Sequence, residues 1–318
     1  MSHTAKISIL GFLAAALVGI FMFIQVGSNW EYVLPRRGYK VLAMVLTGAA
    51  IAFSTIIFQT VTNNRILTPS IIGLDALYVL IQTVVIFAFG SSSIVVLNKQ
   101  LNFIICLAVM VGFALLLYQF LFRGEGRNLY FLLLVGVVCG TLFGSLSTFM
   151  QVLIDPNEFF FVQDRMFASF NNINTDLLLL SAAGVIGVGL YSRKWLKYLD
   201  VLALGREEAI NLGVNYASVV QRLLVIIAVL VSISTALVGP VTFLGLLVAN
   251  VTYEFMQTYR HHILLASAIL ISIIALVGGQ LLVERVFAFS TPLSVIINFI
   301  GGSYFLYLLL RESRAWSR

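Results

Sequence analysis

Residues 199–215, LDVLALGREEAINLGVN, are the one long charged segment with a helical pattern between two strongly apolar stretches of this chain. Its apolar residues can share one face of a short helix while its charged residues point elsewhere. The first set is Leu202, Ala209 and Leu212, the second is Arg206, Glu207 and Glu208, and Gly205 and Gly213 punctuate the pattern. The segment is therefore predicted to be a short amphipathic helix, which either lies along lipid headgroups or docks into a groove on a partner.

The rest of the chain is too apolar for a soluble protein. Of its 318 residues, 60% are hydrophobic and 10% are charged, whereas soluble domains have roughly a quarter of their residues charged. A helical membrane span needs roughly 20 mostly apolar residues. We therefore predict an all-α polytopic membrane protein, forming a single domain over residues 1–318, with ten transmembrane helices. The expected spans are residues 7–26, 40–62, 71–90, 101–122, 129–151, 174–192, 216–238, 241–257, 263–283 and 293–310.

Positive charge indicates the orientation in the membrane. The first span follows Lys6 as a signal peptide would, but its apolar run is long and no clear cleavage site follows, so we expect it to be retained. Ten spans place both termini on one side, and a cytoplasmic location for them puts 13 of the 19 lysines and arginines inside and six outside. The six are Arg36, Arg37, Lys40, Lys99, Arg165 and Arg285. This bias accounts for the net charge of +6 without a nucleic-acid partner.

Few residues point to chemistry. The chain has no Walker A motif, dinucleotide loop, nucleophile elbow or zinc-protease helix, so we expect no enzymatic activity and no ATP hydrolysis by this chain. Cys106 and Cys139 are expected to be small buried residues, and His261 and His262 to lie at a cytoplasmic turn. No cofactor and no metal site are expected.

Ionisable residues are expected only near the span ends, where Asp75, Arg222, Glu254 and Glu284 lie. Ion-coupled carriers usually keep such groups at mid-membrane, so this distribution argues against a secondary transporter. The fifth span carries small residues at four-residue spacing, with a weakly polar stripe beside them. These are Gly136, Gly140 and Gly144, and Thr141, Ser145 and Thr148. The pattern indicates either close helix packing or the wall of a transport path.

Five segments, in order and spacing, resemble the permeases of bacterial ABC importers for iron-siderophore complexes and vitamin B12, the FecCD/BtuC type. They are LPRRGYKVLAMVLTGAAIAFSTIIFQ (34–59), NNRILTPSIIGLD (63–75), LALGREEAINLGV (202–214), GPVTFLGLLVAN (239–250) and STPLSVIINFIGGSYFLYLLLR (290–311). The second segment is similar to the branch that serves catecholate siderophores such as petrobactin. In GPVTFLGLLVAN, Ala249 and Asn250 replace the proline and histidine of the family pattern.

The resemblance implies that residues 199–215 couple the permease to a cytoplasmic ABC ATPase subunit. The family pattern LGEExAxxLGV is matched at Leu204, Gly205, Glu207, Glu208, Ala209, Leu212, Gly213 and Val214, with Arg206 between the Leu-Gly pair and the glutamates. A short helix between two spans could transmit a closing motion of the ATPase to both of them.

On the outer face, the resemblance implies arginines that meet an extracellular or periplasmic siderophore-binding (lipo)protein. Arg36 fits the second arginine of the family's RLPR pattern, Val33 replaces the first, Arg37 could substitute for it, and Arg285 closes the ninth span. Interfacial anchoring is the alternative role of these arginines. The resemblance further implies a second permease chain, a related heteromeric partner. Membrane lipid is expected around both chains, and the weakly polar stripe makes Thr141, Ser145 and Thr148 the candidates for lining the path.

Three rival functions remain at this point. The same architecture could import haem or cobalamin. A proton-coupled siderophore carrier would work without an ATPase and would need titratable residues at mid-span. A membrane-embedded enzyme would need clustered polar side chains at a common depth, and the sequence indicates no such cluster.

Overall fold

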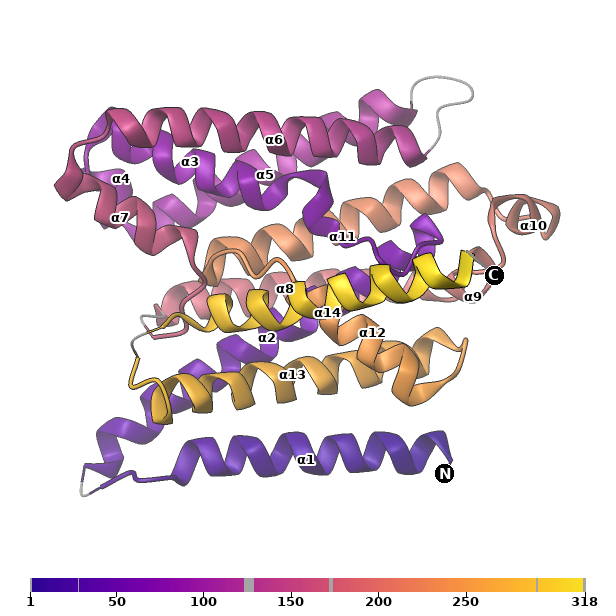
Figure 1. Cartoon of the computed structure of the whole chain (residues 1–318), viewed down its shortest axis with the longest axis horizontal. Coiled ribbons are helices and arrows are strands. Elements are labelled where there is room, and N and C mark those ends of the chain that lie inside the picture. Colours follow the sequence, from indigo (N-terminus) through magenta and orange to yellow (C-terminus); the bar gives the residue numbers. More distant parts are fainter. Residues whose placement is uncertain (1, 28, 123–128, 172–173, 290, 317–318) are drawn as a thin grey trace.

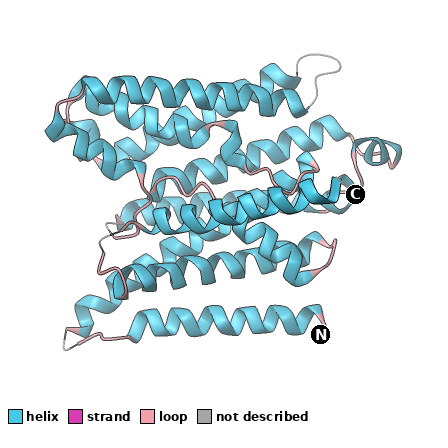
Figure 2. Cartoon of the chain, viewed as in Figure 1, coloured by secondary structure: helices cyan, strands magenta, loops and turns pink. Residues whose placement is uncertain are grey.

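The computed structural model describes the backbone of residues 2–27, 29–122, 129–171, 174–289 and 291–316. It describes their side chains except for residues 95, 120–122, 129, 308–309 and 311–316. Every regular element in these ranges is a helix (Figure 2). The long helices are α1 (His3–Phe23), α2 (Trp30–Thr62), α3 (Leu74–Phe89), α5 (Lys99–Phe122), α6 (Leu129–Leu153), α8 (Thr175–Leu196), α11 (Tyr216–Val238), α12 (Leu244–Met256), α13 (His261–Arg285) and α14 (Leu293–Trp316). The short ones are η1 (Pro69–Ile72), α4 (Ile94–Leu97), α7 (Pro156–Met166), α9 (Leu199–Leu202) and α10 (Arg206–Asn211).

The ten long helices correspond one to one with the ten predicted spans. Within the described residues, seven are long and apolar enough to cross a membrane, and α3, α12 and the described part of α14 are shorter apolar helices. One boundary differs clearly, because α2 begins at Trp30 rather than near residue 40. The ten or so extra residues extend α2 beyond the expected span at its N-terminal end.

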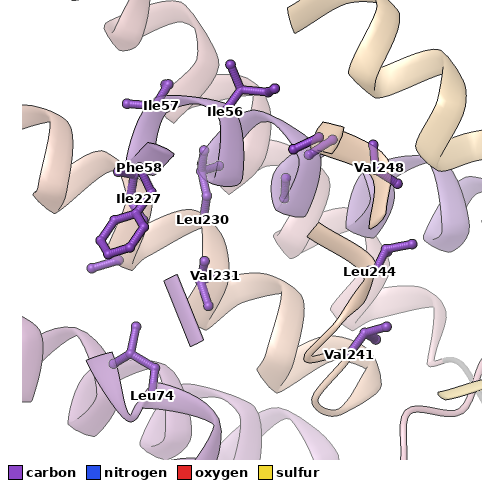
Figure 3. Close-up of a cluster of buried hydrophobic side chains, with 14 of the residues drawn as sticks. Ile56, Ile57, Phe58, Leu74, Ile227, Leu230, Val231, Val241, Leu244 and Val248 are labelled. Atoms are coloured by element: carbon purple, nitrogen blue, oxygen red, sulfur yellow. The ribbon is translucent and has the colours of Figure 1, made fainter. Parts of the chain in front are cut away.

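The helices lie side by side around a central group. Figure 1 shows α1 and α6 at opposite edges of the bundle, with α2 and α11 between them. In the most apolar stretch of α11, 72% of the residues are buried, compared with 17% in the corresponding stretches of α1 and α6. Figure 3 shows part of this core, where Leu74 of α3, Val231 of α11 and Val241, just before α12, lie near one another. The edge helices therefore present most of their apolar surface outward, to lipid or to another chain.

Two of the apolar helices are too short to cross the membrane by themselves. α3 has 16 residues and α12 has 13, which correspond to about 24 and 20 Å, against a hydrocarbon core of about 30 Å. Each is preceded by a segment that is not α-helical, residues 63–73 before α3, which include the 3₁₀ turn η1, and 239–243 before α12. The parts next to the helices, 69–73 and 239–243, are buried or half-buried in the bundle. Irregular backbone is tolerated at membrane depth only where protein surrounds it.

The topology agrees with the predicted orientation. The start of α1, the end of α14, and α9 and α10 lie at the same end of the bundle (Figure 1). The positive-inside bias assigns this end to the cytoplasm. Arg123, Arg127 and Arg318 and the side chains of Arg311 and Arg314, which contribute to that bias, lie outside the described residues.

Candidate coupling segment, docking face and transport path

Residues 199–215 form two short helices rather than the single helix predicted. α9 ends at Leu202 and α10 begins at Arg206, with a turn between them in which Gly205 has φ +110°. This backbone conformation is one that L-residues rarely adopt, so glycine is required where the chain changes direction. In Figure 1, α10 projects beyond the ends of the membrane helices.

The segment has one buried and one exposed face. Leu202 is 2% exposed and Ala209 is fully buried against the bundle. Leu212, predicted to share their face, is 62% exposed instead, as is Leu204 at 60%. Leu212 follows Asn211, the last residue of α10, where the chain turns toward Gly213, so a single helical projection misplaces it. Ile210, Glu207 and Glu208 are also exposed, and the outward face therefore combines apolar and acidic side chains.

The C-terminal end of α10 is closed by a second glycine. Gly213 has φ +81°, and its N–H donates to the carbonyl of Ile210 at 2.9 Å. The N–H of Val214 donates to the carbonyl of Ala209 at 3.0 Å. This arrangement is typical of helices that end on a left-handed glycine. It returns the chain directly into α11, where the Asn215 side chain accepts from the N–H of Ser218 at 3.2 Å.

A buried histidine fastens the segment to two membrane helices. Asp200 Oδ1 in α9 lies 2.6 Å from His261 Nδ1 and also accepts from the backbone N–H of His261 at 2.9 Å. His261 Nε2 lies 2.8 Å from Thr60 Oγ1 of α2. Burial favours the neutral form of Asp200, but the hydrogen bonds from His261 hold the pKa of its carboxyl below the usual value.

His261, expected at a cytoplasmic turn, is the first residue of α13, and its side chain is buried between α9, α2 and α13. Sequence reasoning missed this link. The only signal was an acid inside residues 199–215 and a histidine at a helix start about 60 residues later, and nothing in the sequence pairs the two. Within the described ranges, no three His, Cys, Asp or Glu side chains gather as a metal site would require.

At the opposite end of the bundle, the three predicted docking arginines have different surroundings. Arg37 donates to the carbonyls of Phe21, Met22 and Ile24 at 2.8–3.0 Å, at the C-terminal end of α1. Arg285 donates to the same Ile24 carbonyl at 3.1 Å and contacts the side chain of Gln25. Both arginines therefore satisfy carbonyl groups that a helix end leaves without partners.

Arg36, the third predicted docking arginine, makes a different contact. It is exposed, and its guanidinium lies over the Tyr32 ring at 4.3 Å. It borders a depression of about 470 Å³ that also contains Arg37, Lys40 and Lys99. The acid in this depression, Glu284, is paired with Lys40 at 3.0 Å. The depression is therefore cationic overall and suits an acidic partner surface.

The glycines and the polar stripe of α6 serve different contacts. A Cβ on Gly136 would lie 2.9 Å from the Ile71 carbonyl oxygen, and one on Gly73 would lie 3.0 Å from the Gly140 Cα. Gly136 and Gly140 therefore allow α6 to pack closely on η1 and the start of α3, as the packing alternative predicted for this part of the helix. Thr141, Ser145 and Thr148 lie on the exposed side of α6. They stay available to line a path.

Asp75 corrects the expectation that acids occur only near membrane boundaries. It is the second residue of α3, yet it accepts from Thr235 Oγ1 at 3.2 Å and lines a small cavity with Ile51 and Thr55 from the middle of the span in α2. Because residues 63–73 enter the bundle before α3 begins, a helix start lies inside the membrane. The absence of charge at span centres is therefore not an argument against ion coupling in this chain.

Buried polar side chains also cluster between helices, which the sequence did not indicate. Gln82 of α3 donates to Asn102 and Cys106 of α5 at 2.8 and 3.1 Å. Thr83 of α3 lies 2.9 Å from Ser147 of α6. These groups satisfy one another across helix interfaces, so their arrangement is that of interhelical packing contacts.

The bundle of apolar helices and the projecting segment between α8 and α11 define a polytopic helical membrane protein. The chain belongs to the FecCD transport family, whose model matches residues 7–311. It is 61% identical to the petrobactin import system permease protein YclO of Bacillus subtilis, over 99% of this chain and 100% of that protein. It is 39% identical to the petrobactin import system permease protein FatC of Bacillus anthracis, over 88% and 79% of the two chains. A metal-chelate type ABC transporter solved in an inward-facing conformation shares the fold, with a TM-score of 0.85 and 21% identity over 97% of this chain and 99% of that one. As a member of this family with many apolar helices, it is a multi-pass protein of a bacterial cell membrane.

Proposed function

We propose that this chain is the permease subunit of an ABC importer that takes up a ferric siderophore of the catecholate type, such as petrobactin. The observation that carries the proposal is the full-length similarity to a petrobactin permease. The whole chain, residues 1–318, acts as a single permease domain. It supplies the passage, and a separate subunit hydrolyses ATP.

The cytoplasmic contact is assigned to the exposed face of residues 199–215. Leu204 and Leu212 present apolar surface that needs a groove, and Glu207 and Glu208 lie beside them. Gly205 and Gly213 set the path of the backbone, Ala209 packs inward, and Val214 leads into α11. The Asp200–His261–Thr60 link supports this role, because a force applied to α10 would reach α2 and α13 as well as the adjoining α8 and α11.

We assign the outer contact to Arg36. Arg37 and Arg285 stabilise the surface around it through their hydrogen bonds to carbonyls at the end of α1. A siderophore-binding (lipo)protein would bring its acidic surface to the cationic depression. The cargo would then pass between this chain and a related second permease, along a wall that includes Thr141, Ser145 and Thr148. Weakly polar side chains let a large anionic chelate pass without binding tightly.

Reconstitution tests the proposal. The chain is placed in proteoliposomes with an ABC ATPase subunit, a related second permease and a siderophore-binding protein, and uptake of radioiron chelates is measured. Ferric petrobactin is expected to enter only with ATP, and haem and cobalamin are not expected to enter. ATP-dependent uptake of haem or cobalamin but not of ferric petrobactin would assign the cargo to the alternative class.

Asp75 allows a direct test against ion coupling. Asp75→Asn keeps the shape of the side chain and removes its charge. In an ATP-driven importer, uptake should remain within about threefold of wild type, since the amide oxygen of the variant can still accept the hydrogen bond from Thr235. An ion-coupled carrier would lose uptake with this variant and would respond to a proton gradient without ATP.

A further inference from the structure

A second cationic depression lies at the cytoplasmic end of the bundle, away from the outer docking face. It has a volume of about 520 Å³ and lies between the last turn of α8 and the first turns of α11. Four cations line it, and all of them are exposed: Arg193, Lys194, Lys197 and Arg222. Four positive charges around one concave surface form a binding site for an anion.

These cations have no acidic partner among the described side chains, where the two ion pairs join Lys40 to Glu284 and His261 to Asp200. Aromatic rings hold two of the cations in place instead. The Arg222 guanidinium lies 4.4 Å from the Trp195 ring centroid, and Lys197 Nζ lies 5.0 Å from that of Tyr198. Cation–π contacts position a cation without neutralising it. The depression therefore keeps its positive charge.

An apolar stripe continues from the depression along α8. Leu179, Ile186 and Leu190 are 68%, 58% and 55% exposed, and their spacing of seven and four residues places them on one side of the helix. In the most apolar stretch of α8, only 22% of the residues are buried. The stripe runs from the outer half of the membrane toward Lys194, which is four residues beyond Leu190. A charged site and an apolar stripe of acyl-chain length thus share one helix.

We propose that this surface, formed by Arg193, Lys194, Lys197, Arg222 and the apolar stripe of α8, binds an anionic phospholipid of the cytoplasmic leaflet. The phosphate occupies the cationic depression and an acyl chain lies along α8. Basic pockets between membrane helices on the cytoplasmic side suit anionic headgroups, and tyrosine and tryptophan favour the depth at which headgroups lie. The combination selects an amphiphile over a free phosphate ion, which could use only the depression.

Because the depression adjoins α9, a bound lipid would contact the base of the coupling segment. Tyr198, which lines the depression, directly precedes α9, and α9 carries Asp200. A lipid at this place would stiffen the joint between α8 and the projecting helices. Charge and exposed apolar surface would bind the lipid, whichever cargo the permease carries.

The test measures lipid retained by the purified full-length chain. The chain is extracted in mild detergent, exchanged into micelles with phosphatidylglycerol or phosphatidylcholine, and analysed by native mass spectrometry. Phosphatidylglycerol should be retained and phosphatidylcholine lost. Lys194→Gln should weaken phosphatidylglycerol binding about fivefold, and adding Lys197→Gln should weaken it about fivefold again. Arg260→Gln, at an exposed cytoplasmic cation outside the depression, is the matched control and should leave binding unchanged.

Two further measurements distinguish a bound phospholipid from a bound phosphate ion. Inorganic phosphate at millimolar concentration should not displace the lipid, and Leu190→Asn should weaken lipid binding through the lost acyl contact. Equal retention of phosphatidylglycerol by wild type and by Lys194→Gln/Lys197→Gln would overturn the proposal, as would displacement by phosphate. Loss of the ATPase subunit from the double variant with lipid retention unchanged would assign the depression to the ATPase instead.

Discussion

At the cytoplasmic end of the bundle, Asp200 and His261 tie a projecting segment to the membrane helices, and that segment turns apolar and acidic side chains outward. At the outer end, Arg37 and Arg285 close the end of α1, and the arginine left facing outward is Arg36. The two ends differ in what a partner would contact. A projecting apolar face offers binding energy and a lever, whereas one exposed cation on a charged surface offers mainly orientation. The proposed ATPase subunit and binding protein would make these two different demands.

The largest expected effect comes from removing the apolar surface of the cytoplasmic end. Leu204→Asp combined with Leu212→Asp should weaken binding of the ATPase subunit at least about a hundredfold, because each leucine buried in a groove contributes about 1.5–3 kcal/mol. Co-purification in detergent and surface plasmon resonance with the ATPase measure this. Tyr259→Asp, at a residue 76% exposed in another cytoplasmic turn, is the control. Undiminished ATPase binding by the double variant would show that these two leucines do not form the ATPase contact.

The anchoring of the segment is the next test. His261→Ala removes the side-chain contacts to Asp200 and Thr60 and leaves Asp200 only the backbone N–H of residue 261, and this should lower the free energy of unfolding by about 1–3 kcal/mol. It should also lower uptake per ATP hydrolysed, because α10 would move without α2 and α13. Thermal melts and coupled uptake assays measure the two effects. His262→Ala, at the exposed neighbouring histidine, should change neither, and equal behaviour of the two variants would remove the anchoring role.

The same link predicts a pH dependence. The pKa of Asp200 is lower in the folded chain than in the unfolded one, so its ionised form stabilises the fold above the unfolded value of about 3.9, and this contribution is lost as pH falls through the folded pKa. The difference in melting temperature between wild type and Asp200→Asn should be full at pH 7 and should shrink below about pH 4. A difference that grew on acidification would contradict the assignment.

The smallest effects are expected at the outer end, where two adjacent arginines can be compared directly. Arg36→Gln should weaken docking of the binding protein by only about two- to fivefold at low salt, in line with an exposed ion pair of about 0.5–1 kcal/mol. Arg37→Gln should instead lower the melting temperature, since the carbonyls of Phe21 and Met22 would lose this donor and that of Ile24 would keep only Arg285. A larger loss of docking in Arg37→Gln than in Arg36→Gln, with stability unchanged, would reverse the roles given to these residues.

The number of apolar helices, their approximate limits and the charged helical segment at residues 199–215 follow from the sequence alone. These properties are local, because roughly 20 apolar residues must form a helix in lipid wherever they occur in the chain. The two glycines that bound α10 were also visible in the pattern of residues 202–214. That Gly205 breaks the segment into two helices was not, because glycine permits a positive φ without requiring it.

The tertiary structure alone decided which polar residues meet. Asp200 finds His261 some 60 residues away, and Arg37 turns to the end of α1 while Arg36 turns to solvent. Asp75 lies at a helix start by sequence and deep in the bundle by structure, since the segment before it folds into the membrane. Hydropathy fixes how many times a chain crosses the bilayer, but contacts between distant residues depend on how the helices pack, and a single sequence carries no local signal for that.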